Sequence, residues 1–175
     1  MDDPATKDEP TAALSLLALY DRALPQVYGY LTSRCGDVAL AEDLTSQTFL
    51  AAVAAVQADP QRQLTIGWLV TVARRRLVDH WRAAAREERK LRIVDRPSLT
   101  TDDGDERLDA AQAQEALRVL SPMARAALTL RYLDDLPVRE VATLLGRTEH
   151  ATEALLVRSR HAFRRAYGER SPDAR

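Results

Sequence analysis

The sequence has little of what builds strands, disulfides or metal sites. It contains one cysteine and six glycines, and aromatic residues make up 5% of the chain. Cys35 cannot form an internal disulfide and has no second cysteine with which to bind a metal. No stretch alternates apolar and polar residues for long enough to make a strand, whereas alanine and leucine dominate and 46% of the residues are hydrophobic. These features predict an all-α fold with a buried core, in one domain or two small ones.

Long apolar segments are also missing. The N-terminal residues MDDPATKDEPTAA are polar and acidic, and they lack the charged-then-apolar order of a signal peptide. No apolar run approaches the length needed to cross a bilayer. We therefore expect a cytoplasmic protein without membrane insertion.

The main feature that is present is a basic amphipathic stretch from Ile66 to Arg92. At 3.6 residues per turn its apolar residues form one stripe, with which we expect Trp68 and Trp81 to pack. Arginine dominates the remaining surface, although the whole chain has a net charge of only -1. A charge run is usually a solvated helix face, but charge concentrated in this way also suggests a polyanionic partner. A membrane surface is less favoured, because little apolar surface would stay exposed.

The residues before this stretch predict a leader and two helices. Residues 1–12 are rich in acids and proline, which predicts a disordered leader. A first helix, interrupted at Pro25, ends at the turn Cys35-Gly36-Asp37, where glycine suits a left-handed position. The segment VALAEDLTSQTFLAAVAAVQ is predicted as one long helix with a polar, partly acidic face, which could be merely solvated.

An acidic linker divides the chain. Residues 94–109, VDRPSLTTDDGDERLD, combine a proline, a glycine and an acid cluster with few apolar residues, which predicts a flexible segment. Its charge is opposite to that of the basic stretch, which it could cover when nucleic acid is absent. The predicted organisation is one helical domain at 13–93, the linker, a second helical domain at 110–168 and a disordered tail at 169–175.

The second domain has the layout of a helix-turn-helix. Ser121 and Pro122 suit the N-cap and first position of a helix, and Gly146 suits the end of the next one. Thr148 can cap a final helix of about seventeen residues, which contains several arginines. Any pair of antiparallel core helices can look similar, so this segment alone leaves DNA binding open.

Three segments carry a resemblance to a known family. They are AEDLTSQTFL at 41–50, IGWLVTVARRRLVDHWR at 66–82 and LSPMARAALTLRYLDDLPVREVATLLGRTEHATEALLVRSRHAFRR at 120–165. Together they resemble the two domains of a bacterial RNA polymerase sigma factor of the extracytoplasmic-function (ECF) group, in the same order and with the linker in the same place. The resemblance implies a non-enzymatic factor that binds core RNA polymerase and promoter DNA, with a possible anti-sigma protein as a further partner.

The resemblance assigns two surfaces to the first domain. Asp43, Thr45 and Gln47 correspond to the surface that docks on the clamp helices of the largest polymerase subunits, whereas Phe49 and Leu50 are expected in the core. The loop at 59–65 and the start of the basic helix correspond to the part that opens the minus-ten element and captures a flipped base. The residues expected to hold that single strand are Arg74, Arg75, Arg76, His80, Arg82 and Arg86. Arg75 stands where the family often has asparagine.

In the second domain the resemblance implies that the final helix enters the major groove at the minus-thirty-five element, and that the domain also meets the polymerase β flap. The expected DNA contacts are Arg147, Thr148, His150, Glu153, Arg158, Arg160 and Arg164. Family members commonly carry lysine and arginine in place of Glu153 and Leu155, and valine in place of Thr152. Glu153 would repel phosphate unless it accepts a hydrogen bond from a cytosine amino group. We therefore expect an unusual upstream element, or a surface partly given to a protein partner through Leu155 and Val157.

Two other classes of function fit less well. An enzyme would need an acid–base or metal site, but Asp79 and His80 are adjacent on a helix and point apart, and His150 and His161 lie roughly 16 Å apart along one face. We expect no catalytic residue, no metal and no cofactor. The alternative is a helix-turn-helix regulator that binds duplex DNA without acting as a sigma factor, which would leave the acidic and basic helices without a joint purpose.

Overall fold

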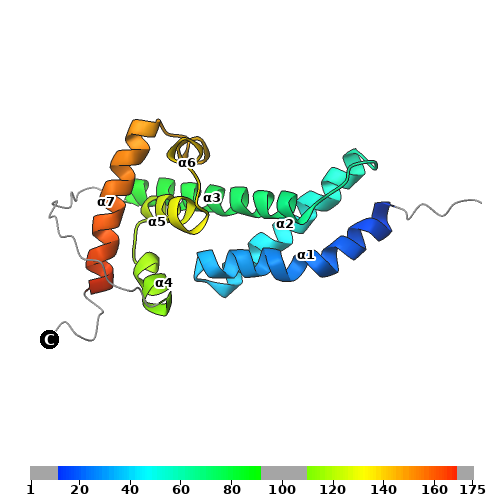
Figure 1. The fold of residues 1–175 in the computed structure, drawn as a ribbon, viewed down its shortest axis with the longest axis horizontal. Coiled ribbons are helices and arrows are strands. Elements are labelled where there is room, and N and C mark those ends of the chain that lie inside the picture. The colour runs from blue at the N-terminus through cyan, green and yellow to red at the C-terminus, as the bar shows by residue number, and fades with distance from the viewer. Residues whose placement is uncertain (1–11, 92–109, 169–175) are drawn as a thin grey trace, which may run out of the picture. The chain divides into compact units, whose positions relative to one another are not determined.

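The computed structural model describes residues 12–91 and 110–168, and every regular element in these two ranges is helical (Figure 1). This confirms the all-α prediction. The predicted linker at 94–109, the tail at 169–175 and all but the last residue of the predicted leader lie outside the described residues. The chain divides into two compact units, Met1–Arg76 and Leu77–Arg175, so that the division falls inside the helix α3 (Ile66–Leu91).

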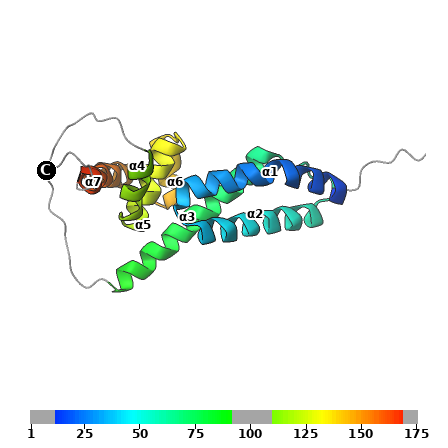
Figure 2. The ribbon, with the colours of Figure 1, turned by 90° about the horizontal axis from the view of Figure 1, so that it is seen from below.

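Two packed helices, α1 (Ala12–Cys35) and α2 (Val38–Ala58), make up most of the first unit. They lie side by side in both ribbon views (Figures 1 and 2). Their buried apolar side chains are mostly small or branched, which lets the two backbones approach closely: Ala23, Val27, Leu31, Cys35, Ala41, Leu44 and Ala52.

The turn between α1 and α2 follows the sequence prediction, but α1 does not break at Pro25. Gly36 has a φ of 65°, the left-handed conformation that glycine adopts without steric cost. Asp37 caps α2 by accepting a hydrogen bond from the Leu40 N–H at 3.1 Å. Pro25 is exposed inside a continuous helix, and the fully buried Ala23 and Val27 flank it. Packing of the residues just before and just after Pro25 therefore stabilises the helix against the loss of one backbone hydrogen bond.

The helix α3 carries the basic stretch and buries one stripe of its surface. The buried residues recur every fourth position at Leu69, Ala73, Leu77, Trp81 and Ala85, with Val78 beside them. Trp81 is only 2% exposed, whereas Trp68 is half-buried. The predicted apolar stripe is confirmed, with Trp68 at its margin.

In the second unit, several short helices precede one long helix. It comprises α4 (Ala110–Arg118), α5 (Pro122–Leu128), a π-helical turn η1 (Thr129–Leu133), α6 (Val138–Leu145) and α7 (Glu149–Gly168). The last helix packs against α4, α5 and α6, so its buried face organises these helices. At 20 residues α7 is somewhat longer than the sequence predicted.

The caps of these helices follow the sequence prediction. The Ser121 hydroxyl accepts a hydrogen bond from the Ala124 N–H, and Pro122 is the first helical residue of α5. Gly146 ends α6 with a φ of 64°. The Thr148 hydroxyl accepts from the Ala151 N–H at 3.2 Å and so caps α7. The helices α6 and α7 with this tight turn form the predicted helix-turn-helix.

Candidate functional site

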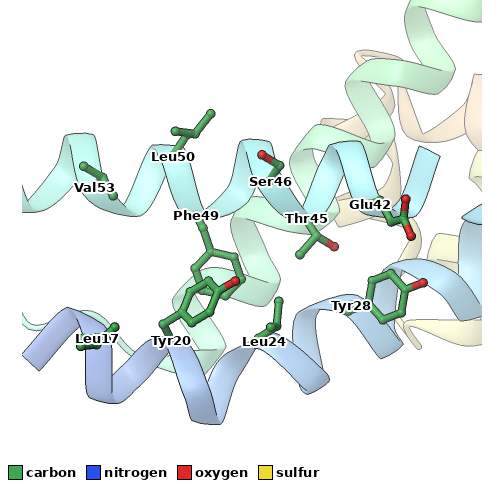
Figure 3. A pocket seen from close by; sticks show the side chains of 10 residues that line it. All are labelled: Leu17, Tyr20, Leu24, Tyr28, Glu42, Thr45, Ser46, Phe49, Leu50 and Val53. Carbon is green, nitrogen blue, oxygen red and sulfur yellow. The ribbon is translucent and has the colours of Figure 1, made fainter. Parts of the chain in front are cut away.

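An open apolar groove runs between α1 and α2. It has a volume of about 580 Å³ (Figure 3). The Tyr20 and Phe49 rings meet edge to face across it, with centroids 4.7 Å apart. Its rim exposes large apolar side chains: Leu17 is 61% exposed and Leu50 is 64% exposed, and Val53 is also exposed. Contiguous exposed apolar surface of this kind marks an interaction site more often than a free surface.

The polar edge of α2 adjoins this groove. The Gln47 side-chain amide donates a hydrogen bond to the Asp43 carboxylate at 2.8 Å, so these two expected docking residues are neighbours on one face. Glu42 and Ser46, both exposed, line the groove itself. The predicted polar, partly acidic face is therefore present at Glu42, Asp43 and Gln47.

The structure corrects one assignment on α2 and shows how a second residue is held. Thr45 is largely buried, and its hydroxyl donates to the Ala41 carbonyl at 2.7 Å, but its side chain also lines the groove (Figure 3). The prediction that Leu50 belongs to the core is wrong, because its side chain stands on the groove rim. Phe49, placed with Leu50 by the sequence, is half-buried in the groove.

The loop before α3 brings together two residues that the sequence prediction did not pair. The Arg62 guanidinium lies over the Trp68 ring, 5.4 Å from its centroid. Asp59 fixes the loop, because its side chain accepts from the Gln61 N–H and its carbonyl accepts from the Arg62 N–H. Thr65 caps α3 by accepting from the Trp68 N–H at 3.1 Å. A cation and an aromatic face thus stand together at the start of the basic helix.

The six basic candidates on α3 do not share one face. Arg75, Arg82 and Arg86 lie on one side of the helix, seven and four residues apart, and Arg82 also pairs with Asp79 at 3.7 Å. We call these three the arginine stripe. Arg76 and His80 are four apart on an adjacent exposed face. Arg74 and Arg82 are half-buried, whereas the other four candidates are exposed, and Arg74 also has an interaction partner.

The outward face of α7 carries most of the candidates in the second unit. One stripe at three- and four-residue spacing is exposed along its whole length and consists of His150, Glu153, Val157, Arg160 and Arg164. We call it the α7 stripe. Arg158 is exposed beside it, while Arg147 and Thr148 lie in the turn before the helix. The C-terminal half of this face is therefore cationic and its N-terminal half is mixed.

Leu155 and Thr152 both lie on the buried face of α7, which corrects the expectation for Leu155. Leu155 is only 9% exposed, so it packs inside the second unit and cannot form the predicted protein-binding surface with Val157. Thr152 is fully buried, and its hydroxyl donates to the Thr148 carbonyl at 2.9 Å. Of the three positions that depart from the family pattern, only Glu153 faces outward.

Comparison with known proteins identifies the family. The family model for sigma-70 region 2 matches residues 19–87, and the one for sigma-70 region 4 matches residues 110–162. The ECF RNA polymerase sigma factor SigK of Mycolicibacterium vanbaalenii is 34% identical over 142 residues, which span 77% of this chain and 72% of SigK. The chain belongs to the ECF sigma factors.

Further similarities extend this assignment. The ECF sigma factor BldN of Streptomyces coelicolor is 35% identical to this sigma factor over 147 residues, which cover 81% of the chain but only 56% of BldN. The chain therefore spans little more than half the length of that relative. The fold is similar to that of the sigma factor RpoE of Bartonella quintana, crystallised with the anti-sigma factor NepR, with a TM-score of 0.52 and 22% identity over 84% of this chain and 92% of RpoE.

The matched regions coincide with the surfaces described above. The region 2 match of this sigma factor includes the groove except for Leu17, the polar edge of α2, the loop before α3 and the arginine stripe. The region 4 match includes the helix-turn-helix and most of the α7 stripe. Within residues 12–91 and 110–168, none of the helices combines the length and the hydropathy of a membrane span. No three histidine, cysteine or acidic side chains in these ranges lie close enough together to bind a metal ion.

Proposed function

We propose that this sigma factor binds core RNA polymerase, opens promoter DNA and anchors the complex upstream, each with a different surface. The observation that carries the proposal is that one chain contains both a region 2 and a region 4 sequence. A regulator that only binds duplex DNA would need the second of these and not the first. We infer that the chain supplies binding and strand opening in the cytoplasm, while the polymerase performs the chemistry.

The polymerase is proposed to dock on the polar edge of α2 and the adjoining groove rim. Asp43 and Gln47 offer hydrogen-bonding groups at the edge, and Leu50 and Val53 offer exposed apolar surface beside them. Burial of two such apolar side chains at an interface contributes about 1.5–3 kcal/mol each at most. A partner helix with apolar and basic residues matches this surface, as do the clamp helices implied by the family. An anti-sigma protein could compete for it.

Strand opening is proposed for the loop before α3 together with the arginine stripe. Single-stranded nucleic acid binds to cationic grooves through its phosphates and to aromatic faces through its bases. The arginine stripe supplies three cations in one line, and Trp68 with Arg62 supplies a stacking platform at the end of that line. An unpaired base held there by stacking, worth about 1–3 kcal/mol, would favour the open duplex.

Upstream anchoring is proposed for α7. The N-terminal residues of a recognition helix contact base edges, while later residues and the turn before it contact phosphates. In this helix His150 and Glu153 fall in the first part, and Arg160 and Arg164 in the second. Arg147 and Thr148, in the turn, are further candidates for phosphate contact.

The experiment combines the purified chain with core polymerase from the bacterium that encodes it. Transcription from a fragmented genomic library, followed by mapping of transcript starts, should give factor-dependent starts with a shared upstream sequence. A chain that binds duplex DNA by itself but yields no such starts would be a helix-turn-helix regulator, and the proposal would be abandoned.

A further inference from the structure

We propose that Glu153 selects a cytosine at one position of the upstream promoter element, by accepting a hydrogen bond from the cytosine amino group. This inference deepens the proposed function of α7 and rests on it. It concerns the one outward-facing position where this chain replaces the cation common in the family by an acid.

Glu153 lies on the outward face of α7. It is exposed in the second turn of α7, three residues after His150 and four before Val157, at the centre of the N-terminal half of the α7 stripe. The opposite face of the helix is occupied by the buried Thr152, Leu155 and Ser159. Its side chain therefore points away from the core of the second unit.

Glu153 has no interaction among the described residues that would explain it as a structural residue. Within the described part of the chain, Glu153 makes no hydrogen bond or ion pair. The residues three and four positions away on the helix include no lysine or arginine, so no intrahelical salt bridge explains it. Glu149 differs, because it is the first residue of α7, where a carboxylate is stabilised by the helix dipole. That effect fades within the first turn and does not extend to Glu153.

The hydrogen-bonding groups of the four bases in the major groove differ in how well they fit a carboxylate. An ionised carboxylate only accepts hydrogen bonds. In the major groove guanine presents two acceptors, and thymine presents an acceptor and a methyl group, so both disfavour a carboxylate. Adenine offers an amino donor beside an acceptor nitrogen, whereas cytosine offers an amino donor alone. Cytosine is therefore the best partner for Glu153.

Electrostatics make the choice selective rather than tight. A carboxylate close to phosphates lowers affinity for every sequence, and only a paired base offsets this cost. The cations Arg160 and Arg164, two and three turns further along the same stripe, can hold the backbone while Glu153 reads the base. A mispaired Glu153 would remain desolvated and unpaired, which penalises the wrong base.

The test is a base-preference profile of the holoenzyme. The full chain is assembled with core polymerase and given a promoter library randomised across the upstream element, and the transcribed templates are sequenced. The wild type should show one position of the upstream element, a column of the profile, at which cytosine is preferred roughly five- to tenfold over the other bases. In Glu153→Gln this column should move toward adenine, because glutamine can donate to N7 and accept from N6 of adenine.

Glu149→Gln is the matched control, since it makes the same chemical change four residues earlier and should leave every column unchanged. An identical profile for the wild type and Glu153→Gln, with transcription still dependent on the promoter, would overturn the inference and leave the proposed function standing. A wild type that starts no transcripts with core polymerase would instead overturn the proposed function on which the inference rests.

Discussion

At the scale of single residues, Leu50 tests whether the groove rim is an interface. It is 64% exposed, so Leu50→Glu should change the free energy of unfolding by no more than about 0.5 kcal/mol. Placing a charge in a buried interface should nevertheless weaken binding to core polymerase about tenfold or more. Native gel titration with labelled core polymerase measures this affinity.

Val38→Glu provides the control for Leu50. Val38 is 62% exposed on the same helix but does not line the groove, so its replacement should leave polymerase affinity unchanged. Equal losses of affinity in both variants would show that general charge, rather than the groove rim, governs binding.

Ser159 tests the packing of α7 at the same scale. Its hydroxyl is buried and has no hydrogen-bond partner among the described residues. Ser159→Ala removes an unpaired polar group and substitutes the better helix former, so the free energy of unfolding should rise by about 1 kcal/mol. Urea titration followed by circular dichroism measures the change, and a decrease of similar size would mean that this hydroxyl has a partner in solution.

Single residues also show where prediction from sequence succeeds. The caps at Ser121, Thr148 and Gly146 were predictable because each depends on the residue itself and its immediate neighbours. The exposure of Leu50 and the burial of Thr45 were not, because apolar residues lie on more than one side of α2 and their spacing does not reveal which side is covered. The contact between Arg62 and Trp68 depends on the path of a loop, which has no fixed spacing in sequence.

At the scale of elements, α3 offers two adjacent arginines with the same charge that lie on different faces of the helix. Arg75 and Arg76 are adjacent and exposed, but they point about 100° apart on the helix. If the arginine stripe holds the opened strand, Arg75→Glu and Arg82→Glu should each reduce stable open complexes about tenfold or more. Permanganate reactivity of unpaired thymines at the promoter reports this directly.

Arg76→Glu makes the same charge change on the adjacent face of α3 and should have a distinctly smaller effect. A loss equal to that of Arg75→Glu would mean that the helix acts through its overall charge and that the stripe has no special role. The sequence alone grouped six basic residues here, because a run of three arginines carries no signal for which face meets the DNA.

At the scale of the whole molecule, we propose a division of labour in which different surfaces of one polypeptide bind polymerase, open the duplex and anchor the complex upstream. The order of the segments and the family were recognisable from sequence, since the region 2 and region 4 motifs are linear stretches. The groove between α1 and α2 was not, because it is formed by side chains from two helices that meet only in the folded chain.

The most direct test of this division compares Asp43→Arg with Arg82→Glu in one transcription assay on the chain's own promoter, with polymerase binding and open-complex formation measured on the same samples. Asp43→Arg should lose polymerase binding and therefore every later step. Arg82→Glu should bind polymerase as the wild type does and fail only at strand opening. Loss of the same step in both variants would contradict the assignment of binding and opening to separate surfaces.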